Sequence, residues 1–163
     1  MPAQKNTFVK LVKNPFKFRV FLLRKLPAGF FTGLKIEEFD ESRCVVSVPY
    51  KWFNKNPFRS TYFASLAMAA ELSTGALAMA NVYGLNPGVS MLVVKIEAGF
   101  LKKATGKTYF TCNDGEEFRK AIDIAVHSGE PQTLQAHSTG VNEAGEEVAR
   151  FAITWSFKVK SVN

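Results

Sequence analysis

Apolar and polar residues alternate most regularly near the C-terminal end of the chain, over Val148–Val159. A repeat of two residues is the period of a β-strand, so one face of this segment is expected in the core and the other in solvent. Five more segments have a similar pattern: Leu34–Phe39, Arg43–Val48, Leu92–Lys102, Lys107–Asn113 and Thr133–Asn142. In Leu92–Lys102 the expected apolar face consists of Leu92, Val94, Ile96, Ala98 and Phe100. The pattern therefore predicts six strands.

The stretch from Ser60 to about Asn81 differs from these strands because it is apolar nearly all round. It has no proline, one internal glycine and many Ala, Leu and Met residues, which favour a helix. Such a helix is expected inside the fold rather than on its surface. A membrane-spanning helix is the competing interpretation, but Ser65, Glu71 and Ser73 interrupt the run and alanine adds little hydrophobicity.

Two further segments have helical patterns. Asn14-Pro15 is a typical helix start, with Asn as the N-cap and Pro at the first helical position, and it predicts a helix over Phe16–Leu26 that Pro27-Ala28-Gly29 ends. Glu116–His127 is the other helix, with Asp114 before it as the expected N-cap. One buried helix and about six strands make an α+β domain, in which the simplest packing is a curved antiparallel sheet around that helix.

The 163 residues fit one domain, 1–163, with residues 1–33 as an N-terminal helical extension and 34–160 as the core. The composition is 47% hydrophobic, which excludes a disordered chain, and its fifteen Phe residues indicate a bulky core or apolar surface kept for a ligand or partner.

The net charge is +7, and eight Lys and Arg precede the first acid, Glu37. This asymmetry is typical of a solvated basic face. No aromatic RNA-binding signature, zinc-finger spacing or basic zipper helix supports a nucleic-acid partner. A membrane-surface role for the basic helix Phe16–Leu26 is the sharper alternative.

Cys44 and Cys112 stand 68 positions apart without a CxxC motif, which indicates neither a metal knuckle nor a redox pair. We expect both to be buried core residues in a reducing compartment. No secretory signal is recognisable, so the chain is expected in the cytoplasm, and an organelle transit peptide is the alternative explanation of its basic, acid-poor N-terminus. His127 and His137 lack metal-ligand spacing, and His127 is expected at a helix end and His137 on a polar strand face. The sequence predicts no metal.

Glu71 is the one acid or base between Arg59 and Lys95, and it lies in the middle of the helix expected to be buried. A carboxylate there is costly unless it is paired, protonated or open to a wet cavity. Its pKa is expected to rise, which suits a general base or acid near neutral pH. A structural hydrogen bond, to a backbone group or across a subunit interface, is the alternative explanation.

The residues before Glu71 sharpen its interpretation. Asn56 lies in the loop that enters the helix, and Tyr62-Phe63-Ala64 forms its early turns. Free backbone N–H groups at a helix N-terminus, together with the positive end of the helix dipole, can bind a developing oxyanion.

These positions resemble hotdog-fold thioesterases of the phenylacetyl-CoA type. That family has an Asn in this loop, His-Gly-Gly six residues later and an acid fifteen residues after the Asn, offsets that fall on Asn56, Tyr62-Phe63-Ala64 and Glu71. Phe100–Gly106 is similar to the family's strand, short basic turn and Gly. Asn56–Gly75 resembles even more a thioesterase-like hotdog branch known only as a domain of unknown function. The similarity extends over roughly Leu34 to Phe157.

The resemblance implies an enzyme that hydrolyses an acyl-CoA or related acyl thioester, with no cofactor besides the CoA thioester as substrate. It implies a homodimer, or a tetramer formed from two such dimers, in which the two sheets of a dimer join edge to edge with the active site between subunits. Because Tyr62 and Glu71 lie about 13 Å apart along one helix, one site is expected to combine the helix start of one chain with the acid of the other.

The roles that the resemblance implies are specific. Glu71 acts as general base on water or as nucleophile, and Asn56 orients the water or the thioester. The N–H groups near Phe63 and Ala64 polarise the carbonyl, with Tyr62 as a possible further donor. Lys102 and Lys103 meet the CoA phosphates, or are solvated turn lysines.

The sequence departs from the family where Tyr62-Phe63-Ala64 replaces His-Gly-Gly. This replacement keeps a non-catalytic acyl-binding or small-molecule-binding hotdog protein as the alternative, since a fold does not establish a function. A hotdog dehydratase or hydratase is the third possibility, and it is weaker because no His accompanies the acid.

Overall fold

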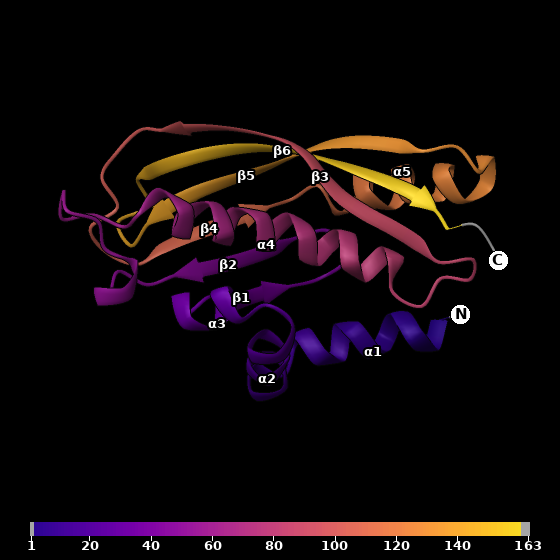
Figure 1. The fold of residues 1–163 in the computed structure, drawn as a ribbon, viewed down its shortest axis with the longest axis horizontal. Helices are drawn as coiled ribbons and strands as arrows, with labels where there is room; N and C mark the ends of the chain where they lie inside the picture. Colours follow the sequence, from indigo (N-terminus) through magenta and orange to yellow (C-terminus); the bar gives the residue numbers. More distant parts are fainter. Residues whose placement is uncertain (1, 161–163) are drawn as a thin grey trace.

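The computed structural model describes residues 2–160, with the side chains of residues 7–160, and these residues form one six-stranded antiparallel sheet and five α-helices (Figure 1). The strands are β1 (Lys35–Phe39), β2 (Cys44–Val48), β3 (Val89–Phe100), β4 (Thr108–Cys112), β5 (Gln132–Asn142) and β6 (Glu147–Val159). The helices are α1 (Pro2–Val12), α2 (Pro15–Lys25), α3 (Pro27–Thr32), α4 (Phe63–Val82) and α5 (Gly115–Ser128), with a short 3-10 helix η1 (Trp52–Asn54).

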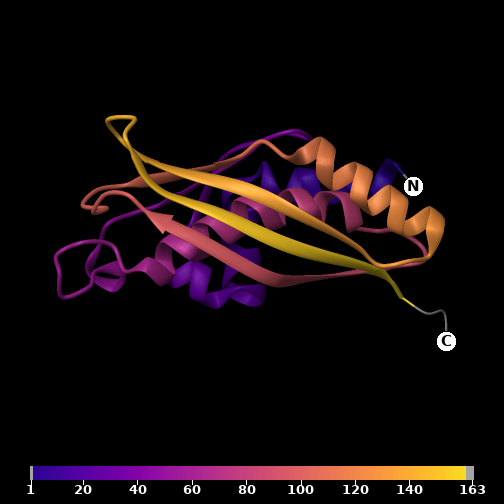
Figure 2. The ribbon, with the colours of Figure 1, turned by 90° about the horizontal axis from the view of Figure 1, so that it is seen from above.

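The strand order in the sheet is β1-β2-β4-β5-β6-β3, so β1 and β3 are the two edge strands. Helix α4 runs along the concave face of the curved sheet, and α1, α2 and α3 lie on the β1 side of it (Figure 1, Figure 2). Helix α5 packs against α4, β5 and β6. The predicted architecture, a curved antiparallel sheet around one long apolar helix, is confirmed.

Helix α4 is buried along most of its length and on most sides, as its lack of a polar face predicts. Two side-chain hydrogen bonds fix it to the sheet: Ser73 Oγ lies 2.8 Å from Ser138 Oγ of β5, and Trp155 Nε1 of β6 donates to Thr74 Oγ1 at 3.0 Å. The helix is long and apolar enough to cross a membrane, but 67% of the relevant window is buried inside the fold. It is therefore the core helix of the domain.

The strand predictions are confirmed in number and order, and the alternation in β6 is confirmed by its burial. The predicted apolar face of Leu92–Lys102 is wrong in part, because a β-bulge interrupts the register between Val93 and Lys95. Leu92 therefore pairs with Ser156 on the outer face of β6, whereas Ile96 pairs with the buried Ile153. A bulge shifts the pattern by one residue, which simple alternation does not reveal.

The N-terminal extension contains three helices rather than the one predicted. Asn14 caps α2 as expected, since its side chain accepts a hydrogen bond from the Lys17 N–H at 3.0 Å. Helix α1 was missed because its sequence is too polar to show a clear apolar face. Pro27 does follow the end of α2, but it also opens the six-residue helix α3, since proline is as suitable at a first helical position as after a helix.

The N-terminal helices contribute to the same core as the sheet. Phe8 and Val12 of α1 and Phe18 and Leu22 of α2 are buried against it. Other aromatic residues are fully enclosed in the sheet and α5, as Phe110, Phe118 and Phe157 are. The many Phe residues thus build the core, yet Phe16, Phe58 and Phe63 remain mostly exposed, so both explanations of the Phe-rich composition hold.

The predicted locations of the two cysteines and two histidines are confirmed. Cys44 and Cys112 are buried and lie opposite each other on β2 and β4, and burial raises the pKa of the Cys112 thiol to about 12. His127 is in the last turn of α5 and His137 is exposed on β5. Asp114 occupies the N-cap position of α5, but its carboxylate accepts from the His137 N–H at 2.6 Å instead of capping the helix.

Candidate functional site

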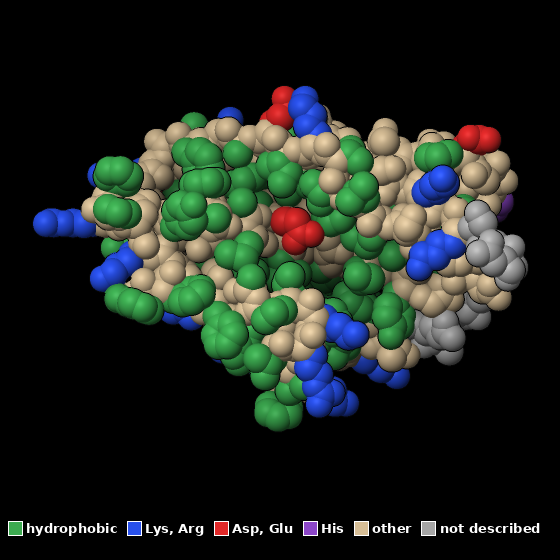
Figure 3. All heavy atoms as spheres, in the orientation of Figure 1, with side chains coloured by type: hydrophobic (Ala, Val, Ile, Leu, Met, Phe, Trp, Pro, Cys, Tyr) green, Lys and Arg blue, Asp and Glu red, His purple; other side chains and the backbone are tan. Residues whose placement is uncertain are grey.

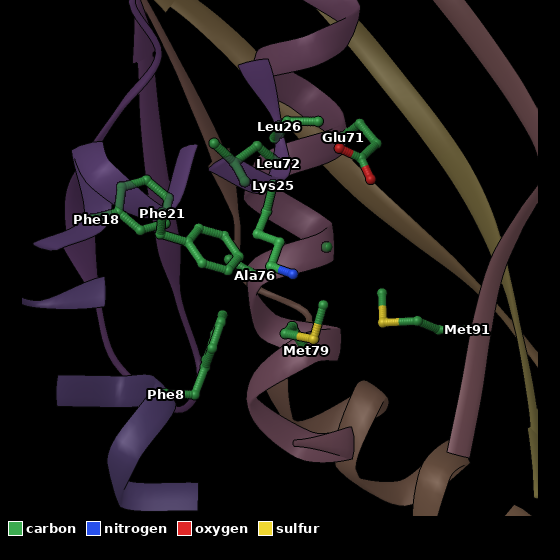
Figure 4. A pocket seen from close by; sticks show the side chains of 11 residues that line it. Phe8, Phe18, Phe21, Lys25, Leu26, Glu71, Leu72, Ala76, Met79 and Met91 are labelled. Atoms are coloured by element: carbon green, nitrogen blue, oxygen red, sulfur yellow. The ribbon is translucent and has the colours of Figure 1, made fainter. Parts of the chain in front are cut away.

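Helix α4 presents Glu71 to a cavity of about 340 Å³. The cavity lies between α4, the N-terminal helices and the start of β3, and its walls include Phe8, Phe18, Phe21, Ala76, Met79 and Met91. The Glu71 carboxylate points into this space, and the aromatic rings stand across from it (Figure 4). The space-filling view shows an acidic side chain in a hollow among hydrophobic groups (Figure 3).

The environment of Glu71 changes its acid–base behaviour. Burial among apolar groups raises the pKa of its carboxyl, since the charged form loses hydration. Within residues 7–160, no hydrogen bond or ion pair compensates this carboxylate, whereas the neighbouring hydroxyls of Ser73 and Thr74 are both bonded. A carboxylate without such a partner is a stronger base than an exposed one and remains free to bind water or a ligand.

Gly75 leaves room for the Glu71 carboxylate one turn further along α4. A Cβ at this position would lie 3.2 Å from Glu71 Oε1 and 3.2 Å from the Trp155 ring. Glycine inside a helix costs roughly 1 kcal/mol relative to alanine. The cost is offset here by the close approach of β6 to the helix and by the space that the carboxylate occupies.

The start of α4 has the free N–H groups that the sequence predicts. Tyr62 is the N-cap, its own N–H donates to the Asn54 carbonyl at 2.6 Å, and the Ser65 N–H donates to the Tyr62 carbonyl at 2.9 Å. Within the described part of the chain, the N–H groups of Phe63 and Ala64 have no acceptor. Two unpaired donors at the positive end of a helix are suited to bind an oxyanion.

Aromatic side chains flank these donors. Tyr62 and Phe63 are 47% and 55% exposed, and their rings meet edge to face with centroids 4.8 Å apart. The Phe63 ring also lies 6.3 Å from that of Phe100 at the end of β3. The helix start therefore has an apolar rim, where the family pattern has two glycines.

Asn56 organises the loop that precedes α4. Its Oδ1 accepts hydrogen bonds from the Phe58 and Ser60 N–H groups at 2.9 and 3.2 Å, and its Nδ2 donates to Ser60 Oγ at 3.1 Å. Arg59 in this loop has a positive φ of 60°, which the tight turn requires. In this structure the Asn56 amide shapes the turn that leads into the helix.

The two turn lysines after β3 have different surroundings. Lys102 Nζ forms an ion pair with Glu146 at 2.6 Å. Lys103 Nζ lies 3.4 Å from the Phe58 carbonyl oxygen, which places it beside the loop before α4. Lys103 is thus the member of the pair that lies near the helix start, together with Arg59 of the same loop.

Within one chain, the structure separates the helix start from Glu71 by more than two turns of α4, about 13 Å. Strand β3 is an edge strand, and within residues 2–160 it pairs with β6 alone. All residues of β3 from Val94 to Phe100 are exposed, although Ile96 and Phe100 face the same side as buried residues of β6. An inward-facing apolar strand without cover is typical of a surface that another chain completes.

The sequence prediction missed the walls that the N-terminal helices supply to the Glu71 cavity. Phe8, Phe18, Phe21 and Lys25 all line it. One signal was present, since the apolar residues of Phe16–Leu26 cover more than one face of that helix. Within residues 2–160, no cluster of three or more His, Cys, Asp or Glu side chains is arranged to hold a metal ion.

Comparisons with known proteins place the domain in a family. The model of the Domain of unknown function (DUF4442) matches residues 17–157. No curated protein sequence matches the chain.

Several solved structures share the fold. A Pseudomonas aeruginosa protein of unknown function, named a probable thioesterase, has a TM-score of 0.75 at 22% identity, over 90% of this chain and 97% of that one. A putative thioesterase from Shewanella oneidensis has a TM-score of 0.71 at 14% identity, over 98% and 100% of the two chains. The E. coli PaaI protein from the phenylacetic acid degradation operon has a TM-score of 0.62 at 14% identity, over 87% and 91%. The fold is therefore the hotdog fold, as the resemblance in the sequence predicted.

Proposed function

The chain belongs to the Domain of unknown function (DUF4442) family, and from this premise we propose that it is a thioesterase that hydrolyses acyl-CoA with Glu71 as the catalytic base. The observation that carries the proposal is the carboxylate of Glu71, which is buried, unpaired within the described residues and directed into an apolar cavity. The thioesterase names of several structural neighbours support the same reaction class.

In the proposed reaction, Glu71 takes one proton from water and later passes it to the leaving sulfur. The Glu71 carboxylate takes a proton from a water molecule while the water oxygen bonds to the thioester carbonyl carbon. The carbonyl electron pair moves onto oxygen, where the N–H groups of Phe63 and Ala64 stabilise it. Collapse of this intermediate breaks the C–S bond, and the leaving sulfur takes the proton from Glu71, which releases the free acid and CoA.

This chemistry needs a homodimer, because the N–H donors and the carboxylate of one chain lie too far apart to act on the same carbonyl. We propose that β3 pairs with β3 of a second copy in antiparallel orientation. This pairing covers Ile96 and Phe100 and aligns the two α4 helices in opposite directions. Glu71 of one chain then approaches the helix start of the other.

The CoA end of the substrate is assigned to the basic turn near the helix start. Lys103 lies beside the loop of Asn56, and Lys102 follows β3 directly. We expect Lys103 to contribute more to phosphate binding, since Lys102 is already paired with Glu146. The free, buried cysteines agree with a cytoplasmic enzyme.

The second candidate function is binding of an acyl thioester without hydrolysis. The observation that favours it is the pair of exposed rings of Tyr62 and Phe63 beside the free N–H groups, because side chains there restrict the approach of a carbonyl.

The test is thioester hydrolysis over a panel of short, long and aromatic acyl-CoAs by wild type, Glu71→Gln and Glu37→Gln. Glu71→Gln is expected to lower kcat by about 10²–10⁴-fold, the usual contribution of a general base. Glu37 is a suitable control because it is a shielded carboxylate outside the cavity. Equal hydrolysis by all three proteins removes Glu71 from the mechanism, and acyl-CoA binding without turnover in wild type establishes the binding function instead.

A further inference from the structure

The cavity below Glu71 is almost entirely apolar. Apart from Glu71 and Lys25, all side chains that line it are hydrocarbon, thioether or aromatic groups, or glycine. Its volume of about 340 Å³ is at the lower end of the range for ligand pockets. Away from Glu71 and Lys25, a polar group in this cavity would find no side-chain hydrogen-bond partner, so most of the lining favours an apolar ligand.

The walls of this cavity come from the N-terminal helices, from α4 and from the start of β3. Phe18 and Phe21 of α2 form one side, and Ala76 and Met79 of α4 lie across from them, with Glu71 and Phe8 toward opposite ends (Figure 4). The Phe8 ring is buried and packs on Tyr83 at 5.6 Å. Since the family match begins at residue 17, α1 supplies a wall that lies outside the matched region.

We propose that this cavity binds the linear acyl chain of the substrate, and that the N-terminal helices set its preferred length. The inference rests on the proposed thioesterase function, which places the thioester carbon beside Glu71. From that carbon, a straight chain would extend along α4 toward Met79 and Phe8. The thioethers of Met79 and Met91 are adaptable and can follow an unbranched chain.

The cavity predicts a dependence on chain length. Each methylene that moves from water into it is expected to raise kcat/KM by about fourfold, the equivalent of the transfer free energy of one CH₂ group. The increase ends where the chain meets Phe8, and longer chains gain nothing further or are hydrolysed more slowly. The profile is therefore expected to have an optimum at intermediate length.

The experiment measures kcat/KM for saturated acyl-CoAs from four to sixteen carbons with three variants. Ala76→Leu fills the cavity and is expected to shift the optimum to shorter chains, while Met79→Ala enlarges it and shifts the optimum to longer ones. Met68→Ala is the matched control, because Met68 is a partly buried methionine of the same helix that does not line the cavity. Met68→Ala is expected to keep the chain-length profile of wild type.

The outcomes separate this inference from the proposed function. If hydrolysis persists but the optimum stays in place in Ala76→Leu and Met79→Ala, the acyl chain lies elsewhere and the inference is overturned, while the thioesterase assignment stands. If wild type hydrolyses no thioester, calorimetric titration with dodecanoyl-CoA still decides. Weaker binding by Ala76→Leu than by Met68→Ala supports the cavity as the acyl site, and equal or absent binding rejects it.

Discussion

The two edges of the sheet finish in opposite ways. At one edge, β1 has only five residues, and its Glu37 is held by Lys35 at 2.6 Å, Lys107 at 2.8 Å and Ser47 at 2.7 Å. At the other edge, β3 has twelve residues, an exposed apolar face, and beside it the unpaired carboxylate of Glu71. The β1 edge is short and its shielded carboxylate is paired within the chain, whereas the β3 edge is long and its apolar face is uncovered.

The two carboxylates show the same contrast in their pKa values. Desolvation acts to raise the pKa of Glu37, but hydrogen bonds from Lys107, Lys35 and Ser47 outweigh it and lower this pKa to about 2. At Glu71 desolvation acts alone and the pKa is raised. The hydrogen-bond partners of Glu37 thus keep it an anion that stabilises the fold. Glu71 has no such partner among the described residues, so its carboxyl can exchange a proton.

The largest expected effect comes from a substitution that prevents a second copy from pairing with β3. Ile96→Lys puts a charge on the inner face of β3, where Ile96 is 48% exposed in the single chain and would be covered in the proposed dimer. We expect a folded monomer whose hydrolysis falls toward the level of Glu71→Gln, on the order of 10²–10⁴-fold. Sedimentation and the hydrolysis assay measure the two effects.

Glu38→Lys is the control for this prediction, because it introduces a lysine at an exposed position on the opposite edge strand. This variant should keep both the oligomeric state and the activity of wild type. An Ile96→Lys protein that remains dimeric and active would show that β3 is not the interface.

The next effect concerns stability at the β1 edge. Glu37→Gln removes charge-assisted hydrogen bonds from two lysines and is expected to lower the free energy of unfolding by about 1–3 kcal/mol at pH 7. Because the folded pKa of about 2 lies below the usual 4.5, this stabilisation is complete above about pH 4.5 and is lost as the pH falls toward 2. Urea unfolding of the variant and wild type should therefore converge in acid, and a constant difference would contradict the assignment.

The smallest effect has the opposite sign and belongs to Glu71. A raised folded pKa means that the folded protein binds its proton more tightly than the unfolded chain, so wild type loses stability as the pH rises through that pKa. Glu71→Gln carries no such charge and is expected to melt a few degrees higher than wild type at pH 8, but at the same temperature near pH 4. A lower melting temperature of the variant at pH 8 would indicate a hidden partner for this carboxylate.

Much of the fold could be predicted because its elements have strong local patterns. The two-residue period of Val148–Val159 and the uniformly apolar stretch around Glu71 are each sufficient to assign an element. The bulge after Val93 could not be predicted, since it depends on how β3 fits the twist of β6. Helix α3 was not predicted, because Pro27 and Gly29 indicate the end of a helix as readily as a short new one.

The candidate site also has parts that the sequence predicts and parts that it does not. Glu71 stands out in the sequence because a lone carboxylate interrupts an apolar helix, and the free N–H groups of Phe63 and Ala64 follow from their position at its start. The roles of Glu71, Asn56, Tyr62, Lys102 and Lys103 remain predictions. The cavity walls from Phe8 and Phe21 were not predictable, because contacts between the N-terminal helices and α4 span some fifty to seventy positions and carry no local signal.

The position of β6 in the sheet has a consequence for folding during synthesis. Among the described residues, strand β3 pairs with β6 alone, and Trp155 of β6 donates a hydrogen bond to Thr74 of α4, so the last described strand completes the cover of the central helix. As synthesis proceeds from the N-terminus, the twenty residues of α4 leave the ribosome long before that strand exists. Until β6 is made, the side of α4 that carries Thr74 lacks its cover, and we expect a nascent chain at this stage to bind chaperones that recognise exposed apolar helices.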